Sequence, residues 1–235
     1  MATANLAPLP AEFATTVASL HRVAEEILAP ARKPDNEISL RATPGGFGTP
    51  EFVHGGVRQR VRVEGDELVR EARGEARRTR LTSLAVAAEL VADLLPAAPG
   101  DEPLAVDREA SLALGSVYEL GAAVLGQLAD EAADDDEPTQ PRLWPEHFDI
   151  AIELGSEADG VRANYGVSPG DDDHPEPYLY VGPWTAEVSG ELWRASGFKG
   201  AELSYSELLA AGGSREEAAS FFRTRTDALK ERRSR

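Results

Sequence analysis

The chain has 235 residues, 41 acidic against 24 basic side chains, a net charge of -17, 42% hydrophobic residues and no cysteine. This length allows one large domain or two small ones, and the composition excludes wholesale disorder. The missing thiols exclude disulfides, thiolate zinc sites, iron–sulfur clusters and cysteine nucleophiles.

The strong negative charge repels phosphates, so we expect no binding to nucleic acid or to anionic membranes. No run approaches the roughly 20 apolar residues that a bilayer crossing needs, and the first residues have neither a basic leader nor an apolar core. We therefore expect a cytoplasmic protein. Nothing in the sequence specifies an oligomeric state.

The first half of the chain predicts helices around a meander of strands. Apolar residues recur every three or four positions over 10–29, which is typical of one face of an amphipathic helix. Alternation over 38–42 and 57–63 predicts antiparallel strands, the second with valines on one face and arginines on the other. Apolar stripes over 81–95 and 114–128 predict two further helices.

The second half returns to strands. An acidic stretch with prolines, at about 130–142, reads as a solvated linker. Alternation over 148–154 and over 161–167, with "GSEADG" between them, predicts a hairpin. Ser214 followed by Glu217 forms the pattern of a capping box and predicts the start of a last helix.

Strands that are grouped apart from helices predict the fold class. We expect one α+β domain spanning residues 1–235, with helices packed on one side of antiparallel sheet. In this domain the linker at about 130–142 separates an N-terminal helix–meander–helix half from a C-terminal hairpin–helix half. A doubly wound fold would require strands and helices to alternate, and they do not.

Polar residues gather at one end of the predicted hairpin. Antiparallel pairing that sets Leu154 near Val161 brings His147 close to Ser168, within two residues of register. The period of two also directs His147 and Asp149 to the same face, away from the apolar stripe. We therefore predict a polar cleft formed by residues 144–149 and 168–178.

This cleft suggests three functions. In the first, the protein binds a small molecule, and the expected ligand-binding residues are Trp144, Glu146, Asp149, Ser168, Asp171 and Tyr178. In the second, it is a metal-dependent hydrolase or isomerase, with His147 or Glu176 as the catalytic base. Candidate ligands for Zn²⁺, Mn²⁺ or Fe²⁺ are His147, Asp149, Asp171, His174 and Glu176. In the third, exposed helices and the acidic linker form a protein-interaction module.

Each of these residues also has a structural interpretation. Acids in the 168–178 loop suit turns, other acids suit caps or ion pairs, and His147 suits packing. Arginines are concentrated between Arg58 and Arg80, where eight of them face five acids. A solvated strand face explains them, and the alternative is an anion site formed by Arg58, Arg60 and Arg62.

The segment "LWPEHFDIAIELG…YGVSPGDDDHPEPYLYVGPW", residues 143 to 184, resembles the signature of an uncharacterised bacterial family, LWPxHFDxA followed by SPGDxxxPEPYxYV. "LHRV" at 20 to 23 is similar to a segment near the start of that family. His174 falls at a variable position of the signature. The positions that match it are His147, Phe148, Asp149, Ser168, Pro169, Gly170, Asp171, Pro175, Glu176, Pro177 and Tyr178. The resemblance implies a site without naming its chemistry.

Overall fold

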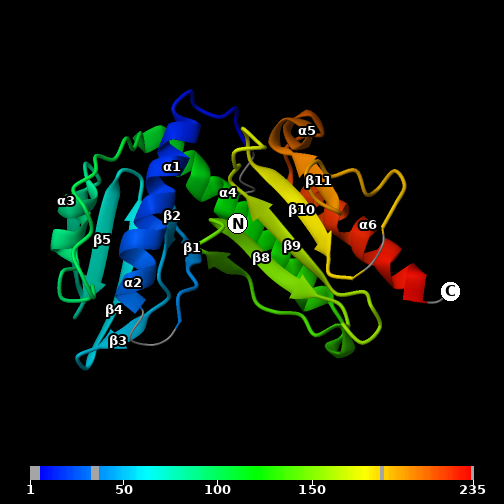
Figure 1. Cartoon of the computed structure of the whole chain (residues 1–235), viewed down its shortest axis with the longest axis horizontal. Helices are drawn as coiled ribbons and strands as arrows, with labels where there is room; N and C mark the ends of the chain where they lie inside the picture. The colour runs from blue at the N-terminus through cyan, green and yellow to red at the C-terminus, as the bar shows by residue number, and fades with distance from the viewer. Residues whose placement is uncertain (1–5, 33–36, 186–187, 234–235) are drawn as a thin grey trace. The chain divides into compact units, whose positions relative to one another are not determined.

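The computed structural model describes residues 6–32, 37–185 and 188–233 (Figure 1). It has an α+β fold with two antiparallel sheets, which confirms the predicted fold class. The chain divides into two compact units. The first unit comprises Leu9–Glu119 and Leu143–Phe148, and the second comprises Leu120–Arg142, Asp149–Arg235 and the residues up to Pro8.

In the first unit a long helical segment covers a sheet. The sheet order is β1-β2-β4-β5-β6, and β3 pairs with β4. Figure 1 shows α1 and α2 lying across this sheet. Val61 and Val63 of β4 are fully buried, as the alternation predicts. The bounds are α1 Phe13–Val23, α2 Ala29–Arg32, β1 Arg41–Thr43, β2 Gly46–Gly48, β3 Phe52–His54, β4 Val57–Glu64, β5 Glu67–Ala72, β6 Glu75–Arg80 and α3 Leu84–Leu90.

The first helical segment extends beyond its predicted end at residue 29. A π-helical turn, η1 (Ala24–Leu28), joins α1 to α2, and the N–H of Ala29 donates to the carbonyl of Ala24. The helix then continues through Pro30 to Arg32. A proline inside a regular α-helix removes a hydrogen bond. The wider turn directly before Pro30 changes that bonding pattern, so the helix does not stop where the proline predicts.

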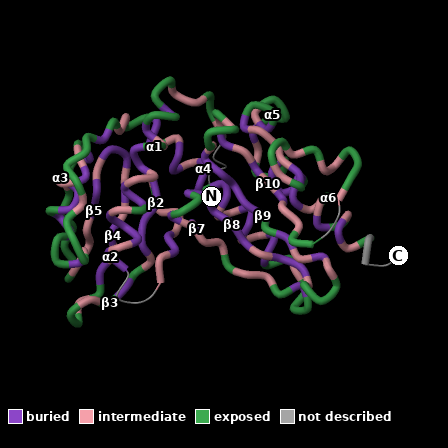
Figure 2. Tube along the Cα trace, in the orientation of Figure 1, coloured by how far each residue is buried: buried purple, intermediate pink, exposed green. Residues whose placement is uncertain are grey.

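The second unit contains a sheet in the order β11-β10-β9-β8-β7. Gly121 of α4 lies against Ile150 and Val167, and the ring of Tyr165 meets that of Phe222 of α6. Both helices therefore cover the same face of the sheet (Figures 1 and 2). The bounds are α4 Arg108–Glu131, which begins in the first unit, η3 Asp134–Asp136, β7 Arg142–Trp144, β8 Asp149–Leu154, β9 Ala163–Ser168, β10 Tyr178–Pro183, β11 Ala201–Ser204, α5 Tyr205–Ala210 and α6 Arg215–Arg233.

The hairpin of β8 and β9 is shifted by two residues from the expected pairing. Ile150 pairs with Val167, which aligns Asp149, and not His147, with Ser168. A shift of two residues keeps every side chain on its expected face of the sheet. The apolar pattern therefore predicted the face correctly but left the position along the strand open.

The acidic stretch at 130–142 is partly folded. Asp136, in the short 3-10 turn η3, is 3% exposed, and its carboxylate lies 2.5 Å from the Nζ of Lys230 on α6. A buried carboxylate requires such a cation to offset its lost hydration. This side chain is therefore an internal anchor of the second unit.

The helix α4 is long and apolar enough to cross a membrane by length and composition alone. Sequence inspection for unbroken apolar runs missed it. More than half of its apolar stretch is buried within the structure, and the core helix of a soluble protein passes the same test. This helix is therefore weak evidence for a membrane span.

Candidate functional site

The predicted site residues are distributed over both units. Trp144, Glu146 and His147 belong to the first unit. The residues in the second unit are Asp149, Ser168, Asp171, His174, Glu176 and Tyr178. Because the predicted cleft draws on both units, it stays a prediction, and we describe the geometry of each group separately.

Residues 144–148 form a tight turn. The N–H of Phe148 donates to the carbonyl of Trp144 over 2.7 Å, and Phe148 has a left-handed backbone with φ of 54°. The buried hydroxyl of Tyr118 donates to the carbonyl of Phe148 over 2.6 Å. The strand begins only at Asp149, so the alternation that was expected to direct His147 does not extend back to it.

The turn is held by the helix that carries "LHRV". The ring of His21 stacks on that of Phe148 with centroids 4.9 Å apart, and its Nε2 lies 2.9 Å from the carbonyl oxygen of Pro145. Glu146 and His147 are exposed, and the His147 ring has no hydrogen-bond partner among the described residues. The "LWPEHF" segment therefore has a clear structural role as a corner that buries Phe148.

In the second unit, two tyrosines project from β10 on the face away from α4 and α6. Tyr178 and Tyr180 are two residues apart, whereas Leu179 between them is buried on the helix side. Tyr180 pairs with Gly166 of β9, where an added Cβ would lie 2.4 Å from the Tyr180 ring. Glycine at this position lets the ring lie across β9, and the Tyr180 hydroxyl donates to the carboxylate of Asp149 on β8.

The loop between β9 and β10 is organised by Asp171. Its Oδ1 accepts the backbone N–H groups of Asp173 and His174, each over 2.9 Å, and its Oδ2 accepts the hydroxyl of Tyr178 over 2.8 Å. Gly170 has φ of 106°, a conformation that glycine adopts easily. The aspartate thus fixes the loop and orients a tyrosine at the same time.

His174 lies between two carboxylates. Its Nδ1 is 2.9 Å from Asp171 Oδ1, its Nε2 is 3.2 Å from Glu202 Oε2 on β11, and its ring centroid is 4.2 Å from that of Tyr178. Burial lowers the pKa of His174, but the hydrogen bonds and charges of Asp171 and Glu202 outweigh it and raise the pKa overall. The two carboxylates thus occupy both ring nitrogens of His174.

The pKa shifts of the neighbouring groups favour the protonation states that these hydrogen bonds require. Burial, and then the carboxylate that each hydroxyl faces, raise the pKa of Tyr178 and of Tyr180. Burial raises the pKa of Asp171, but hydrogen bonds from Tyr178, His174 and the backbone outweigh it and lower the pKa overall. Both tyrosines are therefore hydrogen-bond donors at neutral pH.

The predicted metal ligands are not arranged around a common point. Within the described ranges, no group of three or more His, Asp or Glu side chains could hold a metal ion. Glu176 instead accepts the hydroxyl of Ser206 over 2.7 Å and its N–H over 3.3 Å, at the start of α5. The metal interpretation of these residues has no geometric support.

We call the assembled group the tyrosine–carboxylate cluster; it consists of Asp149, Asp171, His174, Tyr178, Tyr180 and Glu202. Sequence reasoning did not assign Tyr180 or Glu202 to the site. The period of two along β10 offers a signal for Tyr180, whereas Glu202 comes from a strand that local patterns did not predict. Phe198 also approaches, with its ring centroid 6.3 Å from that of Tyr180.

Comparison of the chain with models of protein families, with curated proteins and with solved structures found no match. The resemblance of residues 143–184 to a bacterial family therefore stays a prediction. The case for a function rests on the geometry of the site.

Proposed function

We propose that the protein binds a small molecule carrying an ammonium or guanidinium group at the tyrosine–carboxylate cluster. One observation carries the proposal: two neighbouring tyrosines of β10 donate their hydroxyls to the carboxylates of Asp149 and Asp171. This arrangement holds aromatic rings and negative charges together on the sheet face that α4 and α6 leave uncovered. Aromatic faces and carboxylates are the two groups that attract organic cations.

The charges of the cluster favour a cation over an anion. The cluster contains three carboxylates and one histidine, and that histidine is enclosed by Asp171 and Glu202. Asp172 and Asp173 add negative charge on the same loop. A field of one sign raises the local concentration of oppositely charged ligands.

The proposal keeps the predicted function class, small-molecule binding, and narrows the ligand chemistry. It uses four of the predicted ligand-binding or metal-binding residues, Asp149, Asp171, His174 and Tyr178, in a different role. In the proposal their carboxylates and hydroxyl attract an organic cation instead of coordinating a metal.

Isothermal titration of the full chain with choline tests this proposal, with its uncharged carbon isostere dimethylbutanol as the matched ligand. We expect saturable binding of choline and none of the isostere. Tyr178→Leu removes one aromatic face, and Glu202→Gln removes one negative charge. Each should weaken choline binding by about three- to thirtyfold, the range of a single cation–π contact.

Tyr165→Phe is the matched control, because Tyr165 lies on the helix-covered face of the same sheet. It should leave choline affinity unchanged. Equal binding of choline and its isostere, or equal weakening by Tyr165→Phe and Tyr178→Leu, would contradict a cation site on this face.

A further inference from the structure

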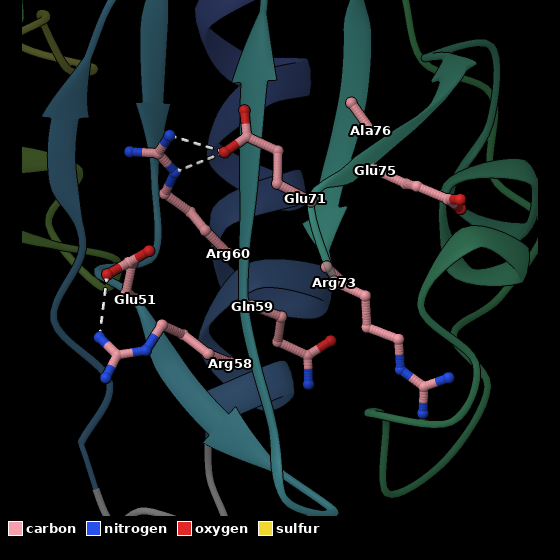
Figure 3. A pocket seen from close by; sticks show the side chains of 10 residues that line it. Glu51, Arg58, Gln59, Arg60, Glu71, Arg73, Glu75 and Ala76 are labelled. Carbon is pink, nitrogen blue, oxygen red and sulfur yellow. Dashed lines mark hydrogen bonds and ion pairs between the residues drawn. The ribbon is translucent and has the colours of Figure 1, made fainter.

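The first unit has a polar pocket of about 450 Å³ (Figure 3). This volume is within the range of about 300–1,000 Å³ for small-molecule sites. The pocket lies where the β5–β6 hairpin turns beside the start of β4. Six charged side chains contribute to its lining: Glu51, Arg58, Arg60, Glu71, Arg73 and Glu75.

Two ion pairs neutralise most of this charge. Arg60 approaches Glu71 to 2.6 Å, and Arg62, which is outside the pocket lining, takes the other oxygen of Glu71 over 3.0 Å. Arg58 and Glu51 lie 3.3 Å apart and are both well exposed. An exposed pair of this kind contributes little to stability. The arginine face predicted from the sequence is therefore largely compensated by glutamates.

Arg73 and Glu75 differ from the other charged residues of the pocket in their ion pairing. Neither has an ion-pair partner among the residues that the structure describes. Both are exposed, and Figure 3 shows their side chains directed apart. The pocket thus presents one unpaired cation and one unpaired anion.

Arg73 is an unusual residue for its position in the β5–β6 turn. Arg73 and Gly74 have φ of 56° and 81° between the paired residues Ala72 and Glu75. A two-residue hairpin turn in which both residues have a left-handed backbone strongly favours the sequences Asn-Gly, Asp-Gly or Gly-Gly. The β3–β4 hairpin has Gly55 and Gly56 in the same conformation, with φ of 56° and 75°. A long, β-carbon-bearing arginine is therefore disfavoured at position 73 on backbone grounds.

We propose that this pocket binds a small zwitterion, with a carboxylate held by Arg73 and an ammonium group held by Glu75. A residue that occupies a backbone conformation disfavoured for its type points to a role outside folding. Planar guanidinium groups bind carboxylates through two parallel hydrogen bonds.

Titration of the full chain with ω-amino acids, from glycine to aminohexanoate, tests this site, with hexanoate and hexylamine as singly charged analogues. We expect at least one ω-amino acid to bind more tightly than either analogue. Arg73→Asn and Glu75→Gln should each weaken that binding about tenfold or more, as expected for one charge-assisted contact. Arg77→Gln, on the same hairpin but outside the pocket lining, should have no effect.

Arg73→Asn also separates binding from folding. Asparagine fits the left-handed turn, so this variant should raise the melting temperature by about 2–4 °C while it loses the ligand. Three results would overturn the proposal: no saturable binding of any ω-amino acid, unchanged affinity in Arg73→Asn, or hexanoate binding as tight as that of the amino acids.

Discussion

Gly166 is the residue on which the geometry of the candidate site depends. An added Cβ would lie 2.4 Å from the Tyr180 ring, much closer than non-bonded carbons approach. The ring reaches Asp149 on the neighbouring strand only because position 166 carries no side chain. The absence of a side chain at Gly166 thus allows the Tyr180 ring and the Asp149 carboxylate to meet.

Gly166→Ala should displace the Tyr180 ring and break its bond to Asp149. We expect a loss of about 1–3 kcal/mol in the free energy of unfolding, typical of overpacking, together with weaker choline binding. Chemical denaturation and titration measure the two effects. Gly182→Ala on the neighbouring strand β10 is the control, because nothing lies within 4 Å of the added Cβ. Equal stability of the two variants would refute this reading of Gly166.

His174 should make the loop sensitive to pH. Its pKa is raised above the ordinary 6.5, because Asp171 and Glu202 outweigh the effect of burial. The stability that it contributes is therefore fully present below pH 6.5 and is lost as pH rises through the folded-state pKa. NMR titration of the ring should give a folded-state pKa above 6.5.

His174→Gln provides the second measurement. The difference in unfolding free energy between wild type and this variant should shrink as pH rises past the His174 pKa. A difference that stays constant with pH would show that the charge of the imidazolium does not hold the loop.

At the scale of elements, the turn formed by residues 144–148 explains why part of the signature segment is structural. Phe148 has a left-handed backbone that is uncommon outside glycine, asparagine and aspartate. It is held there by a stacked His21 ring and by the hydroxyl of Tyr118. Contacts from two helices therefore maintain the corner.

Tyr118→Phe removes the donor to the buried carbonyl of Phe148. We expect a loss of about 1–3 kcal/mol in unfolding free energy, the cost of an unsatisfied buried acceptor. His147→Ala, an exposed change in the same turn, should stay within about 0.5 kcal/mol of wild type. Denaturant titration of the two variants checks this. Similar losses in both would show that the turn is not anchored from Tyr118.

The sequence predicted some of the strands and site residues and missed others. Alternating apolar residues predicted strands in both sheets and the buried faces of β4 and β8, because burial of one face imposes a period of two. The same rule failed at His147, since a left-handed turn held by distant aromatic residues interrupts the strand. The site residues 171 and 178 were found from local motifs, whereas Glu202 joins them through strand pairing that no local pattern encodes.

At the scale of the whole molecule, the net charge of -17 opposes the compact state through self-repulsion. Raising sodium chloride from about 0.01 M to about 0.1 M shortens the screening length from about 30 Å to about 10 Å. We therefore expect the melting temperature to rise over this range, as followed by circular dichroism.

Choline chloride at the same ionic strength separates screening from binding. A ligand that binds only the folded state adds stability beyond that of screening. The melting temperature should therefore be higher in choline chloride than in sodium chloride. Identical curves in the two salts would mean that screening alone accounts for the effect.

The most direct test of the central claim follows the tyrosine rings of the full chain by NMR during a choline titration. The chain has five tyrosines, which makes each ring assignable by single Phe substitution. We predict saturable shifts at Tyr178 and Tyr180 and none at Tyr165, which faces the helices of the same unit. Shifts that are absent from Tyr178 and Tyr180, or equally large at Tyr165, would contradict a cation site on the face of this sheet that carries Tyr178 and Tyr180.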